Sequence, residues 1–143
     1  MGCDIVLAAE IDAEPETVYE AITTQKGEAS FWTSDCDLEQ TLGSEGRFGF
    51  PGAPVDARVR VDQLDPGRKV VWTNLGDFPF WKDTMITWDL EPRDGKTHVF
   101  FRHGNWSEEY PEHDFASVNW VWAQILGRLK GFAETGEPQP FFG

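Results

Sequence analysis

Alternating hydrophobic and polar positions run through the middle of the chain and predict a series of β-strands. The alternation is clearest over residues 55–64, where Val55, Ala57, Val59 and Val61 share one side and mostly charged residues occupy the other. Such a strand buries one face and exposes the other to water, as antiparallel sheets allow. Shorter patterns of the same type predict further strands over residues 3–12, 36–41, 46–50, 69–75, 84–91 and 96–104, the last two joined as a hairpin through 92–95.

A different periodicity, with apolar residues three or four positions apart, predicts helices near both ends of the chain. The longest covers residues 113–135 and ends at Gly136, a residue that commonly stops helices. A shorter helix is expected over residues 12–24, with Pro15 in its first turn. Residues 27–33 are expected to form a second short helix or a turn.

The order of these elements is one strand, one or two short helices, about six strands and a long helix, which is typical of the α+β class. We expect a curved antiparallel sheet of about six or seven strands that grips the long C-terminal helix. The length of 143 residues fits a single domain over residues 1–143. A sheet that curls around one helix encloses a space, which side chains either fill or leave hollow.

The net charge of the chain excludes some classes of binding partner. Twelve Lys and Arg residues face 25 Asp and Glu residues, a net charge of -13. Such a surface repels phosphate backbones and anionic lipid, so neither a nucleic acid nor a membrane is expected as a partner. The chain also holds seven Trp and 11 Phe residues, which indicates that a large apolar core or cavity is enclosed.

The two cysteines, Cys3 and Cys36, are too few for a disulfide framework. A single bridge between them is one interpretation, and two reduced thiols in a cytoplasmic protein is the one we favour. The N-terminus lacks the basic start and long apolar stretch of a signal peptide. No run approaches the roughly 18 apolar residues of a membrane span.

Several stretches of the chain resemble a known family. They are residues 11–23, the FWT of residues 31–33, the glycine-rich 43–50, the hairpin 88–104 and the helix end 126–136. Together they resemble the START-like helix-grip (SRPBCC) superfamily and, within it, the homologues of the activator of the heat-shock-90 chaperone ATPase (AHSA1-like). The resemblance implies a helix-grip fold whose members bind lipids, sterols or plant hormones, or cyclise polyketides. It supplies no invariant catalytic set, so it implies no catalytic residue, metal or cofactor here.

The residues expected to face the enclosed space are mostly aromatic, with a few polar groups among them. Alternation turns Asn74 and His103 inward, and Asn119 falls in the apolar stripe of the long helix. A few polar groups beside an apolar space are typical of a ligand pocket. The predicted ligand-binding residues are Trp32, Phe48, Phe50, Trp72, Asn74, Phe80, Trp81, Trp88, Phe101, His103, Asn119 and Trp122.

A solid core is the alternative interpretation of the same residues. In that case the aromatic residues fill the interior, His103 is a hydrogen-bonded core residue, Asn74 begins a turn and Asn119 is exposed. The aromatic loop over residues 77–83 also has two interpretations. It either caps the mouth of a cavity together with Trp32 or forms a dimer patch.

Three functions are therefore weighed. The first is binding of a small hydrophobic or aromatic molecule between the sheet and the C-terminal helix. The second is a protein-interaction module, with a chaperone or a second copy of the chain as its partner. The third is a cyclase- or hydrolase-like enzyme that uses the same cavity with His103 as a base. We rank binding first, so no catalytic activity is assigned.

Overall fold

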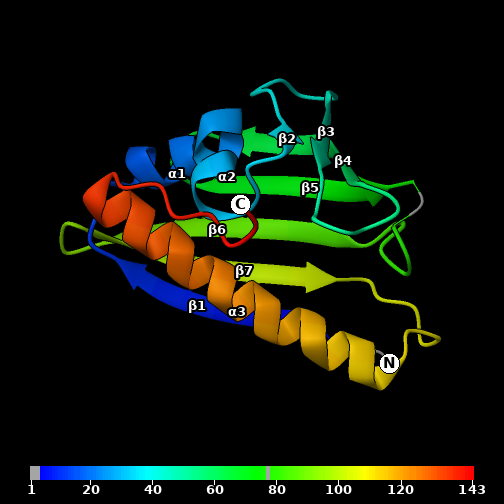
Figure 1. Ribbon diagram of the computed structural model, residues 1–143. Coiled ribbons are helices and arrows are strands. Elements are labelled where there is room, and N and C mark those ends of the chain that lie inside the picture. The colour runs from blue at the N-terminus through cyan, green and yellow to red at the C-terminus, as the bar shows by residue number, and fades with distance from the viewer. Residues whose placement is uncertain (1–3, 77) are drawn as a thin grey trace.

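The computed structural model describes residues 4–76 and 78–143, and it contains one seven-stranded antiparallel sheet. Cys3 lies outside the described residues. The strand order is β1-β7-β6-β5-β4-β3-β2, so the first strand of the chain pairs with the last (Figure 1). The strands are β1 (Ile5–Ile11), β2 (Cys36–Asp37), β3 (Glu45–Phe48), β4 (Ala57–Asp65), β5 (Lys69–Leu75), β6 (Met85–Arg93) and β7 (Lys96–Gly104).

Three helices lie on one face of this sheet, and the long one crosses it diagonally in Figure 1. They are α1 (Pro15–Thr23), α2 (Gln25–Phe31) and α3 (Glu112–Thr135). Gly136 ends α3 in the left-handed conformation, with φ of 77°, as expected of a glycine at a helix end. The predicted fold class, a curved antiparallel sheet gripping a long C-terminal helix, is confirmed.

The hairpin between β6 and β7 is tighter than predicted. Its turn consists of Asp94 and Gly95 alone, with φ of 51° and 80°. Positive φ at both positions is the signature of the two-residue turn that suits the twist of a hairpin, and Asp-Gly favours it. Pro92 therefore belongs to β6, where it opposes Thr97 on β7. On its other side β5 has already ended, because Lys69, the first residue of β5, pairs with Asp89.

The alternation of the sequence holds on the long strands, whose inner residues are buried beneath the helices. The prediction fails at the two short strands, β2 at the edge of the sheet and β3 beside it. β2 consists of two residues, and β3 ends at Phe48, so Phe50 lies in the loop that follows. Among the described residues, no helix is long and apolar enough to cross a membrane.

Candidate functional site: an apolar cavity under the long helix

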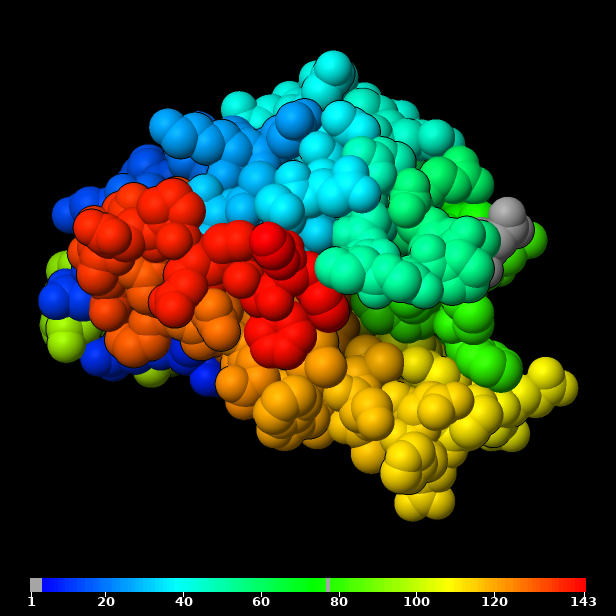
Figure 2. Space-filling model, in the orientation of Figure 1, coloured from blue at the N-terminus to red at the C-terminus, as the bar shows by residue number. Residues whose placement is uncertain are grey.

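A cavity of about 220 Å³ lies between α3, the end of α2 and the loops that follow β3 and β5. Four of the predicted binding residues line it, and they are Trp32, Phe50, Trp81 and Trp122. Phe78 lines it as well, so two aromatic residues of the loop after β5 and Trp32 border the same cavity. In Figure 2 the C-terminal segment, the loop around residue 53 and α3 meet on the face that the picture shows.

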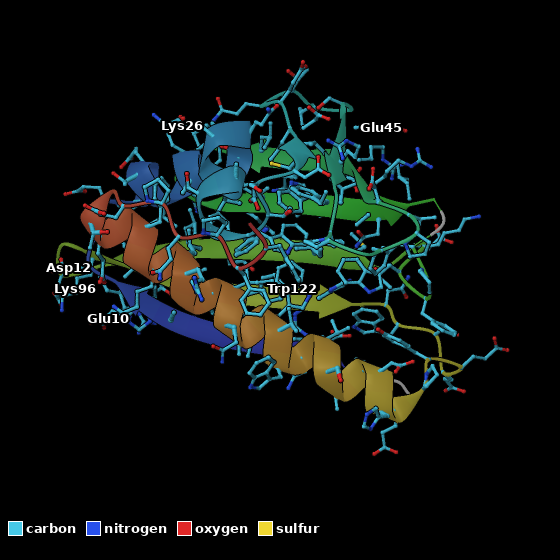
Figure 3. All side chains as sticks on the ribbon, viewed as in Figure 1. Glu10, Asp12, Lys26, Glu45, Lys96 and Trp122 are labelled. Atoms are coloured by element: carbon cyan, nitrogen blue, oxygen red, sulfur yellow. The ribbon has the colours of Figure 1, made fainter. Side chains whose placement is uncertain are left out.

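Trp32 and Trp122 line the cavity next to each other, and two different helices supply them. Trp32 ends α2, and Trp122 projects from the middle of α3 toward the sheet (Figure 3). Their ring centroids are 4.8 Å apart, and Trp32 also packs at 4.3 Å on Phe48. Offset and tilted contacts at these distances are favourable for aromatic rings.

The remaining lining residues come from three segments. Ala53 follows Phe50, and Phe142 belongs to the C-terminal segment. The helix α3 supplies Ser117, Val118, Val121 and Ile125. The helical periodicity of residues 113–135 predicts that Val118 and Ile125 lie on the apolar stripe of the helix. No periodic pattern points to Ala53 or Phe142.

Phe142 is held against the site by backbone hydrogen bonds. Its N–H donates to the carbonyl of Trp32 at 2.8 Å, and its own carbonyl accepts from the N–H of Ser34 at 3.0 Å. Its ring packs on Phe50 with a centroid distance of 5.0 Å. The C-terminal segment thus forms a wall of the cavity, a long-range contact that local sequence patterns do not reveal.

Four of the predicted binding residues fill the core instead of lining the cavity. Phe48, Trp72, Trp88 and Phe101 are fully buried on the inner face of the sheet. Trp88 lies among three of the other rings, with centroids 4.8 Å from Phe101, 6.1 Å from Trp72 and 6.3 Å from Trp122. Side chains therefore fill the interior over the centre of the sheet. Toward the loop after β5, the interior contains the cavity.

His103 and Asn74 do point inward as predicted, but the His103 ring nitrogens and the Asn74 amide N–H group contact other protein groups. The Asn74 side-chain oxygen is buried without a hydrogen-bond partner among the described residues. The indole N–H of Trp122 donates to Nδ1 of His103 at 3.0 Å, so Nδ1 carries no proton. Nε2 therefore carries it and donates to the Thr84 hydroxyl at 2.9 Å. That hydroxyl donates to the carbonyl of Trp81 at 2.5 Å and accepts from the Asn74 amide at 3.0 Å.

This cluster has a structural consequence for the cavity. Complete burial lowers the pKa of His103 well below its usual range, so the ring is neutral at pH 7. The chain of bonds from Trp122 through His103 and Thr84 to Trp81 ties α3 to the loop after β5. Both tryptophans line the cavity, so the cluster positions two of its walls. Thr84 was missed in the sequence because a lone threonine at a strand end carries no signal.

Two predicted binding residues lie outside the cavity. Asn119 is exposed, so the expectation that it points inward is wrong. It sits at the edge of the apolar stripe, whose centre follows Val118, Trp122 and Ile125. Phe80 is 42% exposed and stacks on Tyr110 with a centroid distance of 4.9 Å, away from the cavity.

Two further titratable groups are buried near α2. The thiol of Cys36 is unbridged, and burial raises its pKa to about 12, so it is not a reactive thiolate. Glu28 is completely buried on α2, and neither of its carboxylate oxygens has a hydrogen-bond partner in the part of the chain that the structure describes. Burial raises the pKa of Glu28 well above its usual value. Within residues 4–76 and 78–143, no cluster of His, Cys, Asp and Glu could hold a metal ion.

A seven-stranded antiparallel sheet, a long helix across it and an apolar cavity between them define a protein of the helix-grip class. The chain matches the family described as "Activator of Hsp90 ATPase homolog 1-like protein" over residues 12–134, and it belongs to that family. A search of curated proteins gives no significant match.

Solved structures share the fold over almost the whole chain. The solution structure of the Aha1 dimer from Colwellia psychrerythraea is 34% identical, with a TM-score of 0.83, over 94% of this chain and 98% of that one. DynU16, from the dynemicin biosynthetic locus, is 23% identical with a TM-score of 0.78 over 96% of this chain, which spans 49% of DynU16. CalU16 from Micromonospora echinospora is 20% identical with a TM-score of 0.69, over 96% of this chain and 77% of that one.

Proposed function

We propose that the protein binds a small apolar or aromatic molecule in the cavity under α3. The observation that supports this proposal most is the lining itself. Among the described residues that line the cavity, Ser117 alone has a polar side chain apart from the tryptophan rings. Burial of apolar surface is the dominant favourable contribution when a ligand enters such a site. Membership of a helix-grip family adds support, since this fold commonly binds hydrophobic ligands.

The size of the cavity limits the ligand. Its volume of about 220 Å³ is about one and a half times that of the roughly 150 Å³ apolar cavity known to take up benzene. A molecule with about ten non-hydrogen atoms, such as a two-ring aromatic, is therefore the expected size. Flat aromatic molecules suit walls made of Trp32, Trp81 and Trp122, because ring faces and edges pack favourably on one another.

Catalysis by His103 is less well supported than binding. A general base needs a free nitrogen within reach of the substrate. The Asn74 amide lies 3.5 Å from Nε2 of His103, so a neighbouring amide exists. Both ring nitrogens are nevertheless hydrogen-bonded to Trp122 and Thr84, and the ring is fully buried. The arrangement favours a structural role for His103.

Naphthalene is the probe for this proposal, and isothermal titration calorimetry and thermal shift are the measurements. Wild type is expected to bind it and to gain thermal stability, because a ligand that binds only the folded state stabilises that state. Val121→Phe is expected to fill the cavity and weaken binding at least tenfold while the protein stays folded. Asn119→Ala, on the exposed side of the same helix, is the matched control. Absence of naphthalene binding to wild type, or equal binding by Val121→Phe, would contradict the proposal.

A second proposal concerns self-association. The Colwellia psychrerythraea structure, 34% identical to this chain, is described as a dimer. We infer that this chain also pairs with a second copy. A chaperone partner, which the family description suggests, is the alternative partner.

A further inference from the structure

The outer face of the sheet, opposite the helices, has a different charge balance from the rest of the molecule. Nine acidic and seven basic residues pair on it or beside it, from Arg47 with Asp35, Asp37 and Asp56 to Arg102 with Asp4. The chain as a whole has 25 acidic and 12 basic residues. The ion-paired residues of this face are therefore closer to charge balance than the chain as a whole.

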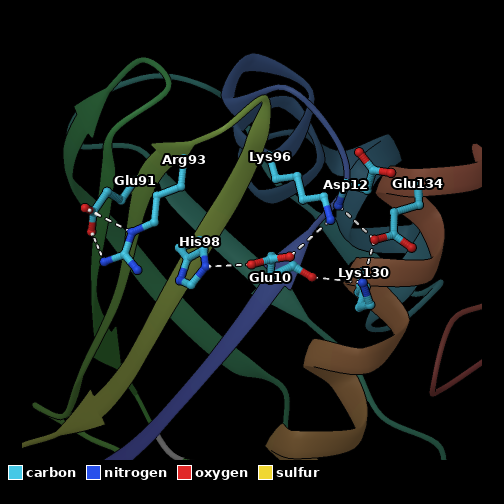
Figure 4. A network of polar contacts seen from close by, with 8 residues as sticks. All are labelled: Glu10, Asp12, Glu91, Arg93, Lys96, His98, Lys130 and Glu134. Atoms are coloured by element: carbon cyan, nitrogen blue, oxygen red, sulfur yellow. Dashed lines mark hydrogen bonds and ion pairs between the residues drawn. The ribbon is translucent and has the colours of Figure 1, made fainter.

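One end of this face shows how completely its charges are matched. Glu10 on β1 accepts from His98 at 3.0 Å and from Lys96 at 3.2 Å, both on the neighbouring strand β7 (Figure 4). Arg93 pairs with Glu91 on β6 in the same view. Carboxylates with cations this close present little net charge to an approaching surface.

An apolar patch lies on the same face across β1 and β7, at one edge of the sheet. Val6 on β1 and Phe100 on β7 are 43% and 41% exposed. In the register of the sheet, Ala8 lies opposite Phe100, and Val6 is diagonal to it across the same strand pair. The guanidinium of Arg102 lies over the Phe100 ring at 5.8 Å and pairs with Asp4 at 2.8 Å. Val6, Ala8 and Phe100 thus form one apolar patch on two adjacent strands, with the Arg102–Asp4 ion pair beside it. This arrangement resembles an interface with an apolar centre and a polar rim.

The other large hydrophobic residues that are notably exposed do not form such a group. Leu42 lies in the loop between β2 and β3, and Phe80 stacks on Tyr110. Trp120, 61% exposed, lies on α3 among polar neighbours. Met85, 41% exposed, begins β6 opposite Gly104, four positions from Asp89, the partner of Phe100. None of these residues is a neighbour of another.

We infer that two copies of this chain pair through the outer faces of their sheets, with Phe100 near the centre of the interface. This inference rests on the homodimer proposed above and names its surface. Two copies that each carry a net charge of -13 repel one another, and the repulsion is weakest where the carboxylates are already paired. The same patch on both subunits is what a two-fold dimer requires.

The size of the face corresponds to the lower end of the range for specific interfaces. Five long strands of seven to nine residues contribute to it, namely β1, β4, β5, β6 and β7. At about 4.8 Å between strands and about 3.3 Å per residue, they cover roughly 24 by 25 Å, or about 600 Å² before side-chain relief is counted. A standard interface buries about 800 Å² per partner, so nearly the whole face would take part.

The pairing is tested by sedimentation equilibrium over 10–200 μM protein in low and high NaCl. Wild type is expected to dimerise more tightly as salt rises, because screening weakens the repulsion between the net charges. Phe100→Lys is expected to weaken dimerisation at least tenfold. Val6→Lys on the neighbouring strand is expected to do the same, so that the result does not depend on one variant folding. Trp120→Lys adds the same charge on α3 and is expected to change the dimerisation constant less than twofold.

The outcomes separate the two levels of the inference. A wild type that stays monomeric at 200 μM in high salt overturns the homodimer itself. A dimer that folded Phe100→Lys and Val6→Lys leave intact overturns the surface but keeps the dimer. A dimer disrupted by Trp120→Lys also overturns the surface, because α3 would then be required. Dimerisation that weakens with salt would indicate pairing of an acidic face with a basic one instead.

Discussion

At the scale of single residues, two buried ionisable groups respond to pH in opposite ways. His103 is held neutral, so its contribution to stability is present above the ordinary histidine pKa of 6.5 and is lost as the pH falls. Glu28 is held protonated, so its contribution is present below the ordinary glutamate pKa of 4.5 and is lost as the pH rises. The two residues differ in hydrogen bonding, because both His103 nitrogens have partners and both Glu28 oxygens have none.

We predict that Glu28→Met stabilises the protein at pH 7 by roughly 1–3 kcal/mol, because it removes an unpartnered buried carboxyl group while keeping a similar volume. Urea unfolding at several pH values provides the measurement. Glu28→Gln is the control that abolishes the titration but keeps a polar group, so its stability advantage over wild type is expected to grow from pH 5 to pH 8. An advantage that does not change with pH would show that Glu28 ionises freely in the folded state.

At the scale of elements, the corner between α1 and α2 determines where Trp32 lies. The Thr24 hydroxyl caps α2 by accepting from the N–H of Gly27 at 3.0 Å. Gly27 itself packs so closely on α1 that an added Cβ would lie 2.1 Å from the carbonyl oxygen of Ala21. The corner therefore needs a glycine inside a helix, where glycine is normally unfavourable. Trp32 follows directly from this corner and reaches the cavity.

We predict that Gly27→Ala destabilises the protein by about 1–3 kcal/mol, because the backbone of α1 must move to accept the methyl group. Gly131→Ala is the matched control within α3, where an added Cβ meets no atom within 4 Å. That variant is expected to stabilise by about 0.5–1 kcal/mol through helix propensity alone. Thermal unfolding followed by circular dichroism compares the two, and a stabilising Gly27→Ala would refute the close-packing argument.

At the scale of the whole molecule, the C-terminal segment closes the site. The N–H groups of Gln139, Phe141 and Phe142 donate to the carbonyls of Ser30, Phe31 and Trp32 at 2.8–3.2 Å. The last residues of the chain thereby run alongside the end of α2, about a hundred positions earlier in the sequence. Trp32, which is 1% exposed, is covered partly by this segment.

We predict that Phe142→Ala widens the opening of the cavity and destabilises the protein by roughly 1–3 kcal/mol, in line with the loss of a half-buried aromatic side chain. Acrylamide quenching of tryptophan fluorescence is expected to increase, and naphthalene affinity is expected to fall. Phe80→Ala, which removes an exposed ring outside the cavity, should leave the affinity unchanged. Equal effects of the two substitutions would indicate that Phe142 is not a wall of the site.

Local patterns in the sequence account for most elements of the fold. The period-two alternation on the long strands correctly places Trp72, Asn74, Trp88, Phe101 and His103 on the inner face. Such patterns succeed because each strand or helix must bury its own apolar face, a requirement that depends only on nearby residues. Such patterns fail for Asn119, because it lies at the edge of the apolar stripe of α3, where the periodicity does not separate buried positions from exposed ones.

Only the tertiary structure decides which inward residues fill the core and which border the cavity. Strand alternation turns Trp88 inward and the helical stripe turns Trp122 inward, yet only Trp122 borders the cavity, whereas Trp88 is surrounded by other rings. The difference arises from segments that meet across the fold, such as Phe142 beside Trp32 and Thr84 beside His103. The sequence by itself determined an aromatic interior under an acidic shell. The packing of distant segments left part of that interior open, because no local pattern specifies how well they fit together.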